Sequence, residues 1–246
     1  MSRRVRKPLI AAGVAVVALA AATATANLAA ADIPPANGEQ LVTATIAVSG
    51  TFDGGNRRFI GSGDLGDGGQ AEGQDPLFRL AAGATLTNVI LGSPASDGVH
   101  CAGSCTLRNV FWEDVGEDAA TFRGTNATVL VDGGQSEGAS DKVFQDNRGA
   151  GGSVTIRNFE ANGFSTFYRS CGNCSTQAAR NVTLSNITAT DGDTLVGINI
   201  NFGDTARLSG ISAGGATICT LFEGNNSGDE PEEVGEGPNN TNCILS

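Results

Sequence analysis

The chain carries an internal repeat with a period of about 21 to 28 residues, the size of one unit of a solenoid protein. Each copy is a short run rich in β-branched residues, usually followed by Asn or Gly and then by a second short apolar stretch. A unit this short cannot bury its apolar side alone, so successive units must stack as parallel strands with aliphatic ladders inside. The repeat therefore predicts an all-β, single-domain parallel β-helix. Its copies begin at TLTNVILG (85–92), TLRNVFWE (106–113), TVLVDGG (128–134), TIRNFEANG (155–163), TLSNITATDG (183–192) and ARLSGISAGG (206–215).

The segments between the repeats argue against other solenoids. None has the length or the apolar period of a helix, and glycine, at 35 residues, has about twice its ordinary share. A leucine-rich repeat is the main alternative, but its dense leucine pattern and helical side are absent. An asparagine recurs two places after an inward aliphatic, where we expect a ladder of left-handed turns. These asparagines are Asn88, Asn109, Asn158 and Asn186.

Residues 1–31 have the pattern of a signal peptide, with a basic start, an apolar run, and small-residue cleavage sites near Ala26 and Ala31. The apolar run is short of the ~20 residues that a membrane span needs, so a membrane anchor is the less favoured alternative. We expect export, and a secreted domain over residues 32–246. Its last part, residues 223–246, is acidic and rich in Gly and Asn, which predicts a loose terminal segment pinned by Cys243.

The mature domain is strongly acidic. The leader holds four of the 15 basic residues and no acidic one, so 11 basic and 26 acidic residues remain, a net charge of −15. This charge argues against nucleic acid as a partner, because nucleic-acid binding needs a basic surface. A polyanionic substrate would also be repelled unless a bound cation or a local basic patch reversed the field.

The six cysteines of an exported protein are expected to form three disulfides. Six thiols allow 15 pairings, and proximity in the sequence favours neighbouring ones. A thiolate zinc site is the alternative, but CGNC (171–174) has no second pair at the usual spacing and His100 is the only histidine. The favoured pairings are Cys101 with Cys105, Cys171 with Cys174, and Cys219 with Cys243.

Counting along the repeats places acidic residues in a column. Asp97 follows Leu86 by 11 residues, and Asp118 follows Leu107 by the same offset. The two carboxylates should therefore lie one strand spacing apart, about 4.8 Å, with Glu117 beside them. Stacked like charges either share a proton or hold a metal ion, and ligands made only of oxygen favour calcium. The alternative is a set of unrelated surface charges.

Two cations follow on the next two coils. When the coils are aligned on Val129 and Ile156, Lys142 and Arg169 each lie 13 residues further on. This alignment predicts that the two side chains stack in one column, directly beyond the carboxylates. Acidic residues on two coils followed by basic residues on the next two, along one face, would rarely arise from a random distribution of surface charges.

At these residues the chain resembles the bacterial and fungal pectate lyases of polysaccharide lyase family 3. The resemblance runs from about residue 66 to residue 177 and is carried by DGVHC, WEDVGEDA, DKVFQ and FYRSCGNCSTQ, in this order. It implies a right-handed parallel β-helix, secretion, calcium dependence, and β-elimination on polygalacturonate (pectate) as the substrate. It also implies that Asp97, Glu117 and Asp118 bind calcium.

The same resemblance assigns roles to the cations. It implies that Lys142 binds a substrate carboxylate and that Arg169 removes the proton, with Lys142 as the next candidate for the catalytic group. The chain departs from the family at two positions where lysine is usual. Arg123 keeps the charge and is expected to bind substrate, although Lys and Arg are not equivalent at a specific contact. Thr166 removes a cation, which affects rate or affinity more than reaction type.

These observations favour a calcium-dependent pectate lyase that leaves a 4,5-unsaturated sugar end. We expect it to act as a monomer, with no membrane or nucleic-acid partner. Two alternatives stay open at the level of sequence. One is a polygalacturonase-like hydrolase that draws its acid and base from Asp97, Glu117 and Asp118. The other is a non-catalytic β-helix that binds sugars and does not turn them over.

Overall fold

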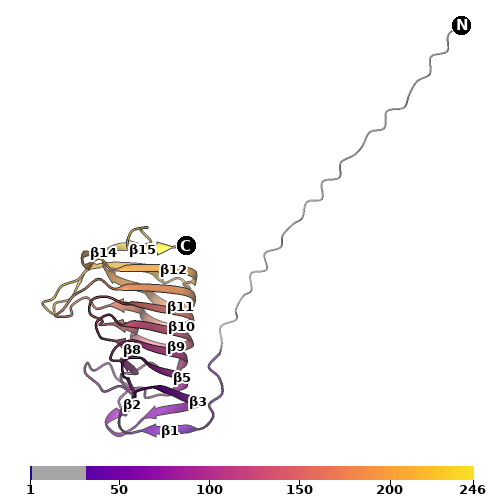
Figure 1. Cartoon of the computed structure of the whole chain (residues 1–246), viewed down its shortest axis with the longest axis vertical. Coiled ribbons are helices and arrows are strands. Elements are labelled where there is room, and N and C mark those ends of the chain that lie inside the picture. Colours follow the sequence, from indigo (N-terminus) through magenta and orange to yellow (C-terminus); the bar gives the residue numbers. More distant parts are fainter. Residues whose placement is uncertain (2–31) are drawn as a thin grey trace.

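The computed structural model describes Met1 and residues 32–246. The predicted signal peptide, with its cleavage sites near Ala26 and Ala31, lies outside the described residues. The described chain winds into an elongated stack of coils that runs from β1 at one end to β14 and β15 at the other (Figure 1). Within these residues, no helix has the length and apolar character required to cross a membrane.

Fifteen strands form one continuous sheet that winds around the axis of the stack. The described residues contain no α-helix, only the 3-10 turns η1 (Gly63–Leu65) and η2 (Ile200–Phe202). The strands are β1 (Glu39–Val42), β2 (Ile46–Val48), β3 (Thr51–Gly61), β4 (Phe78–Leu80), β5 (Ala84–Leu91), β6 (Val99–Cys101), β7 (Cys105–Trp112), β8 (Asp118–Phe122), β9 (Thr128–Asp146), β10 (Ser153–Ser170), β11 (Asn181–Asn199), β12 (Thr205–Ser212), β13 (Thr217–Glu223), β14 (Glu232–Gly237) and β15 (Cys243–Leu245).

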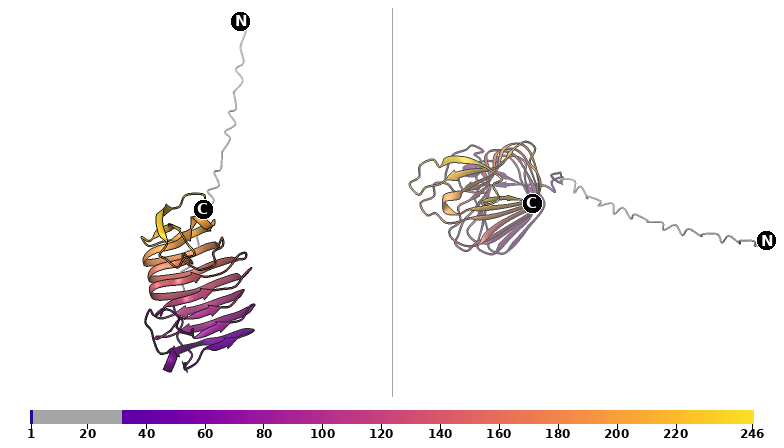
Figure 2. Two further views of the ribbon diagram at one scale, coloured as in Figure 1. Left: turned by 90° about the vertical axis from the view of Figure 1, so that its left-hand side faces the viewer. Right: turned by 90° about the horizontal axis from the view of Figure 1, so that it is seen from above.

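The pairing of the strands is that of a parallel β-solenoid. One ladder runs in the order β1-β3-β5-β7-β9-β10-β11-β12-β15, and a second runs β2-β4-β6-β8-β9. All pairs between strands are parallel except the antiparallel pair of β13 and β14. Seen along the stack, the strands of successive coils overlie one another (Figure 2). The all-β solenoid predicted from the repeat is confirmed.

Inside the solenoid, buried aliphatic side chains stack in a column with one residue from each coil, called the aliphatic ladder below. Each of its members is at most 1% exposed. Burying one such side chain stabilises the fold by about 1.5 to 3 kcal/mol, so the stack is held mainly by these contacts. In register, the ladder is Leu86, Leu107, Val131, Ile156, Leu184 and Leu208.

This ladder corrects the alignment of the cations. Leu107 pairs with Val131, not with Val129, so the predicted shared column of Lys142 and Arg169 is wrong. Strand β9 also has one residue more than β10 just before Lys142, where the register shifts. As a result Lys142 pairs with Asp118 on one side and with Thr166 on the other.

The predicted turn ladder is confirmed. Asn88, Asn109, Asn158 and Asn186 all have left-handed backbones, with φ between 51° and 55°. The amide of Asn109 donates to Asn88 Oδ1, and that of Asn186 donates to Asn158 Oδ1, both at 3.2 Å. On β9 the equivalent residue is Gly133, with φ 77°, where a Cβ would lie only 2.7 Å from Asn109 Oδ1. A local turn conformation thus repeats along the stack.

The acidic terminal segment is more ordered than the sequence predicts. Strand β14 pairs with β13, and β15 adds a parallel strand to β12, so residues 223–246 close the end of the solenoid. The predicted pinning by Cys243 is confirmed, since the Cys219–Cys243 disulfide holds β15 beside the last coil. The predicted looseness is wrong where β14 and β15 pair with neighbouring strands. All three favoured pairings form, including Cys101–Cys105 and Cys171–Cys174.

We predict that replacing Cys219 and Cys243 by Ala destabilises the solenoid by about 3 kcal/mol, because this bond closes a long loop in the unfolded chain. Replacing Cys171 and Cys174 is the control, and should cost only about 2 kcal/mol since its loop is far shorter. Urea unfolding of the two double variants measures the difference. Equal losses would contradict a tethering role for the terminal disulfide.

Candidate functional site

An open cleft of about 250 Å³ lies over the face formed by β4, β6, β8 and β9. Acidic and basic side chains are interspersed on its wall: Arg79 forms an ion pair with Asp75, and Lys142 Nζ lies 4.0 Å from Asp118 Oδ1. A lining of both signs is suited to a ligand that carries both bound cations and anionic groups. The charged lining residues are Glu72, Asp75, Arg79, Asp97, Glu117, Asp118, Arg123 and Lys142.

The register of two short strands stacks the predicted carboxylates. Val99 of β6 pairs with Ala120 of β8, and Asp97 and Asp118 each lie two residues earlier. One carboxylate oxygen from each of these residues and one from Glu117 lie within 4.8 Å of one another, and all three residues are buried. The turns before the carboxylates pack closely, since a Cβ on Gly116 would lie 1.9 Å from the carbonyl of Ser96. The acidic column is therefore built as the sequence predicts.

Two oxygens of this cluster accept no hydrogen bond from the protein. Asp97 Oδ2 lies 2.7 Å from His100 Nε2, and Asp118 Oδ2 accepts a hydrogen bond of 3.4 Å from Thr121. The other oxygens, Asp97 Oδ1 and Asp118 Oδ1, are buried and unpaired. An unpaired buried carboxylate oxygen is costly, and a hard cation with oxygen ligands removes that cost. The donor set and its unused oxygens fit calcium.

Two of the carboxyl groups have raised pKa values. Burial, followed by repulsion from Asp118 and Asp97, raises the pKa of Glu117 to about 9. Burial also raises the pKa of Asp118 to about 8, although the nearby Lys142 opposes the shift. Three carboxylates at this spacing therefore cannot all be charged near neutral pH unless a cation lies between them.

Lys142 lies beside the carboxylate cluster in the cleft. Its Nζ lies 4.0 Å from Asp118 Oδ1 and is hydrogen-bonded to Asp141. Burial opposes the charge of this amine, but the carboxylates of Asp118 and Asp141 outweigh it and raise the pKa of Lys142. Arg123 lines the same cleft and is exposed. Thr166 extends the column of Lys142 without adding a cation.

Arg169 lies one coil further along and outside the set of residues that line the cleft. It pairs in register with Gln145, which does line the cleft. Its guanidinium carbon lies 4.1 Å over the ring of Phe222, and its Nη2 is buried without a partner. Burial lowers the pKa of Arg169 to about 10. Arg169 therefore does not line the cleft that holds the carboxylates, and it lies in the column of Gln145 and not in that of Lys142.

Several residues of this region are not found by sequence reasoning. His100 could have been detected, because it follows Asp97 by three residues in DGVHC and bonds to its carboxylate. Gln145, Asn199 and Phe222 lie in ordinary repeat strands and carry no local signal. Tertiary stacking alone brings the last two against Arg169.

Comparison with known proteins gives one consistent result. The pectate lyase family model matches residues 30–229. Probable pectate lyase D of Neosartorya fischeri is 44% identical over 230 residues, which are 91% of this chain and 93% of that protein. Probable pectate lyase E of Aspergillus oryzae is 46% identical over 213 residues, which are 85% of this chain and 81% of that protein.

Solved structures agree with the sequence relatives. The catalytic domain of pectate lyase PelI from Erwinia chrysanthemi is similar with a TM-score of 0.66 at 30% identity, covering 85% of this chain and 96% of that one. Pectate lyase PelI in complex with tetragalacturonic acid is similar with a TM-score of 0.62, also at 30% identity, covering 84% of this chain and 68% of that one.

We predict that the metal-free protein loses stability as the pH rises from about 4 toward 9. The folded pKa values of about 8 for Asp118 and about 9 for Glu117 lie above the ordinary value of about 4, so the fold favours the protonated groups. This stabilisation is fully present below pH 4 and is lost by pH 9. Melting temperatures in chelator across this range measure the effect.

The control for this measurement is the double variant Glu117→Gln and Asp118→Asn, which removes both titrating groups. Its melting temperature should depend less on pH than that of the wild type in the same buffers. Calcium should raise the wild-type melting temperature most at pH 9. Identical pH profiles for the two proteins would show that the carboxylates are not perturbed.

Proposed function

The chain belongs to the pectate lyase family and has pectate lyase activity on pectate; on this premise we propose how its residues divide the reaction. Asp97, Glu117 and Asp118 hold calcium, Lys142 and Arg123 bind substrate carboxylates, and Arg169 removes the proton. The observation that carries the proposal is the buried carboxylate cluster with two unpaired oxygens, beside Lys142.

The substrate is a polyanion, whereas the chain is acidic overall. Calcium supplies Lewis-acid polarisation of a galacturonate carboxylate when it is bound. Lys142 and Arg123 add positive charge on the same cleft. The local field can therefore attract the anionic substrate that the net charge of −11 of the whole chain repels. The relative crystallised with tetragalacturonic acid supports an oligogalacturonate as the ligand of this cleft.

Arg169 is the group we assign to proton removal. It takes the proton from C5, the C5–H electron pair forms the double bond to C4, and the bond from C4 to the glycosidic oxygen breaks. The leaving oxygen takes up a proton from water. An ordinary arginine has a pKa above ~12 and is a poor base, so the pKa of about 10 produced by burial favours this role. We expect an alkaline pH optimum.

The hydrolase alternative is less well supported. A hydrolase needs its two carboxyl groups about 5 to 9.5 Å apart, so that the sugar or a water molecule fits between them. Here oxygens of all three candidate carboxylates lie within 4.8 Å of one another, and the relatives are named as pectate lyases. A non-catalytic sugar-binding protein would not need the buried Arg169 with its unpaired Nη2.

We also propose that the protein is secreted and acts as a monomer. Three disulfides among the described residues support an oxidising compartment. A sedimentation experiment on the purified domain tests the oligomeric state.

We predict that chelation abolishes turnover and leaves the solenoid folded, because the aliphatic ladder and not an ion holds the coils together. Added calcium should restore turnover, and Asp118→Ala should raise the calcium concentration needed. The assay follows the ultraviolet absorbance of the 4,5-unsaturated product, which hydrolysis does not create. Full activity in the chelated enzyme would rule out the metal role of the three carboxylates.

We predict that Arg169→Lys lowers turnover at least ~100-fold, the low end for loss of a general base. Lysine keeps a charge but changes reach and geometry. The calcium requirement should barely change, because Arg169 on β10 lies two coils beyond Asp118 on β8. Arg123→Lys is the control and should be mild. Near-normal turnover with an unshifted pH optimum in Arg169→Lys would leave Lys142 as the candidate base.

A further inference from the structure

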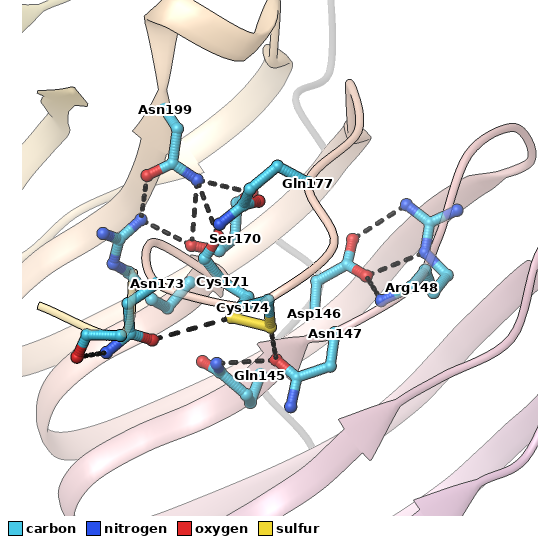
Figure 3. The surroundings of a disulfide bond; sticks show 12 residues. Gln145, Asp146, Asn147, Arg148, Ser170, Cys171, Asn173, Cys174, Gln177 and Asn199 are labelled. Atoms are coloured by element: carbon cyan, nitrogen blue, oxygen red, sulfur yellow. Dashed lines mark hydrogen bonds and ion pairs between the residues drawn. A yellow bond between two sulfur atoms is a disulfide. The ribbon is translucent and has the colours of Figure 1, made fainter. Parts of the chain in front are cut away.

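Asn199, the last residue of β11, is fully buried and holds Arg169 from one side. Its Oδ1 accepts a hydrogen bond of 3.2 Å from Arg169 Nη1, which also donates to the carbonyl of Ser170. The opposite end of the amide, Nδ2, donates to the Ser170 and Cys171 carbonyls at 3.3 and 3.0 Å. Figure 3 shows this side chain directed toward Ser170 and Cys171.

These contacts determine which way the amide points. Backbone carbonyls cannot donate, so the end of Asn199 that faces Ser170 and Cys171 must be the NH₂ group. The oxygen is therefore left for Arg169. The orientation is a consequence of the fold, because a flipped amide would place Oδ1 against two carbonyl oxygens and Nδ2 against a guanidinium.

The backbone around Asn199 is held from several directions. Asp204 accepts hydrogen bonds from the Asn199 N–H at 2.9 Å and from the Ser170 hydroxyl. The carbonyl of Cys171 lies beside the Cys171–Cys174 disulfide (Figure 3) and also accepts from Arg180 Nη1. This network uses buried polar groups that neither calcium nor substrate binding requires.

Several charged groups influence Arg169, but the side chain that accepts a hydrogen bond from it, Asn199, is neutral. Burial is the largest influence on its pKa and lowers it; Asp204, Tyr168 and Glu230 act in the opposite sense, and Arg180 adds to the lowering. Within the described chain, no carboxylate forms an ion pair with Arg169. Its direct side-chain contacts are the amide of Asn199 and the ring of Phe222.

We propose that Asn199 is a positioning residue for Arg169: its neutral amide oxygen accepts a hydrogen bond from Nη1 and so fixes the guanidinium without adding a negative charge. A carboxylate in this place would also accept a hydrogen bond from Nη1 but would stabilise the proton of the guanidinium. The inference rests on the proposed role of Arg169 as the base.

The main test is Asn199→Asp, which keeps an acceptor for Nη1 and adds a charge. A carboxylate at this distance shifts the pKa of its partner by about one to three units, here upward. We expect the ascending limb of the kcat profile, on which rate increases as Arg169 loses its proton, to move up by at least about one pH unit, with KM and the calcium requirement nearly unchanged. A profile that coincides with the wild type in folded protein would overturn the proposal.

Asn199→Ser is the second variant, because Asp at this position would face the Ser170 and Cys171 carbonyls and the Asp204 carboxylate, to which Asn199 Nδ2 now donates, and could impair folding. Serine is too short to reach Arg169, so kcat should fall at least ~10-fold with little change in KM. The matched control is Asn201→Ser, which loses hydrogen bonds to Gly224 but makes no contact with Arg169, and should keep its kcat. Equal losses of kcat in the two serine variants would reduce Asn199 to a structural role and refute the proposal.

Arg169→Lys, measured in parallel, separates the two hypotheses. If that variant has normal turnover, the assignment of Arg169 as the base fails and the role of Asn199 fails with it. If Arg169→Lys is inactive while both Asn199 variants retain wild-type kcat and pH profile, only the positioning role is wrong.

Discussion

The parallel stacking of one coil on the next is the constraint on which the rest of the structure depends. Each coil buries one rung of the aliphatic ladder, and the in-register hydrogen bonds then determine what lies above each side chain. Because the pairing of β6 with β8 places Val99 against Ala120, it also brings the carboxylates of Asp97 and Asp118 together. The packing of the core and the pairing of the strands therefore position the carboxylates, although these core contacts take no part in the chemistry.

The same stacking divides the site between coils. The acidic cluster and Lys142 lie on β8, β9 and the turns that precede β6 and β8, whereas Arg169 lies on β10. Burial of the charged carboxylates, followed by repulsion from the neighbouring carboxylates, raises the pKa values of Glu117 and Asp118. The apolar interior stabilises the fold enough to hold these groups in place before any cation binds.

Two buried arginines of the solenoid show how a neighbour sets the state of a guanidinium. Arg148 forms an ion pair of 2.8 Å with Asp146, both of them fully buried; burial opposes its charge, but this carboxylate prevails and raises its pKa. Arg169 is buried among an amide, a carbonyl and an aromatic ring, and its pKa is lowered. The ion pair with Asp146 keeps Arg148 protonated. The surroundings of Arg169 make a proton easier to lose, as a base requires.

The sequence by itself determined the solenoid, the disulfide pairing and the column of Asp97, Glu117 and Asp118, because these follow from local spacing within similar repeats. The tertiary structure decided the column of Lys142 and the partners of Arg169. Val129 and Val131 both point inward, so a slip of two residues keeps the alternation of the strand and cannot be detected from the pattern. The extra residue in β9 and the approach of Asn199 depend equally on packing between coils, about which the spacing within one coil carries no information.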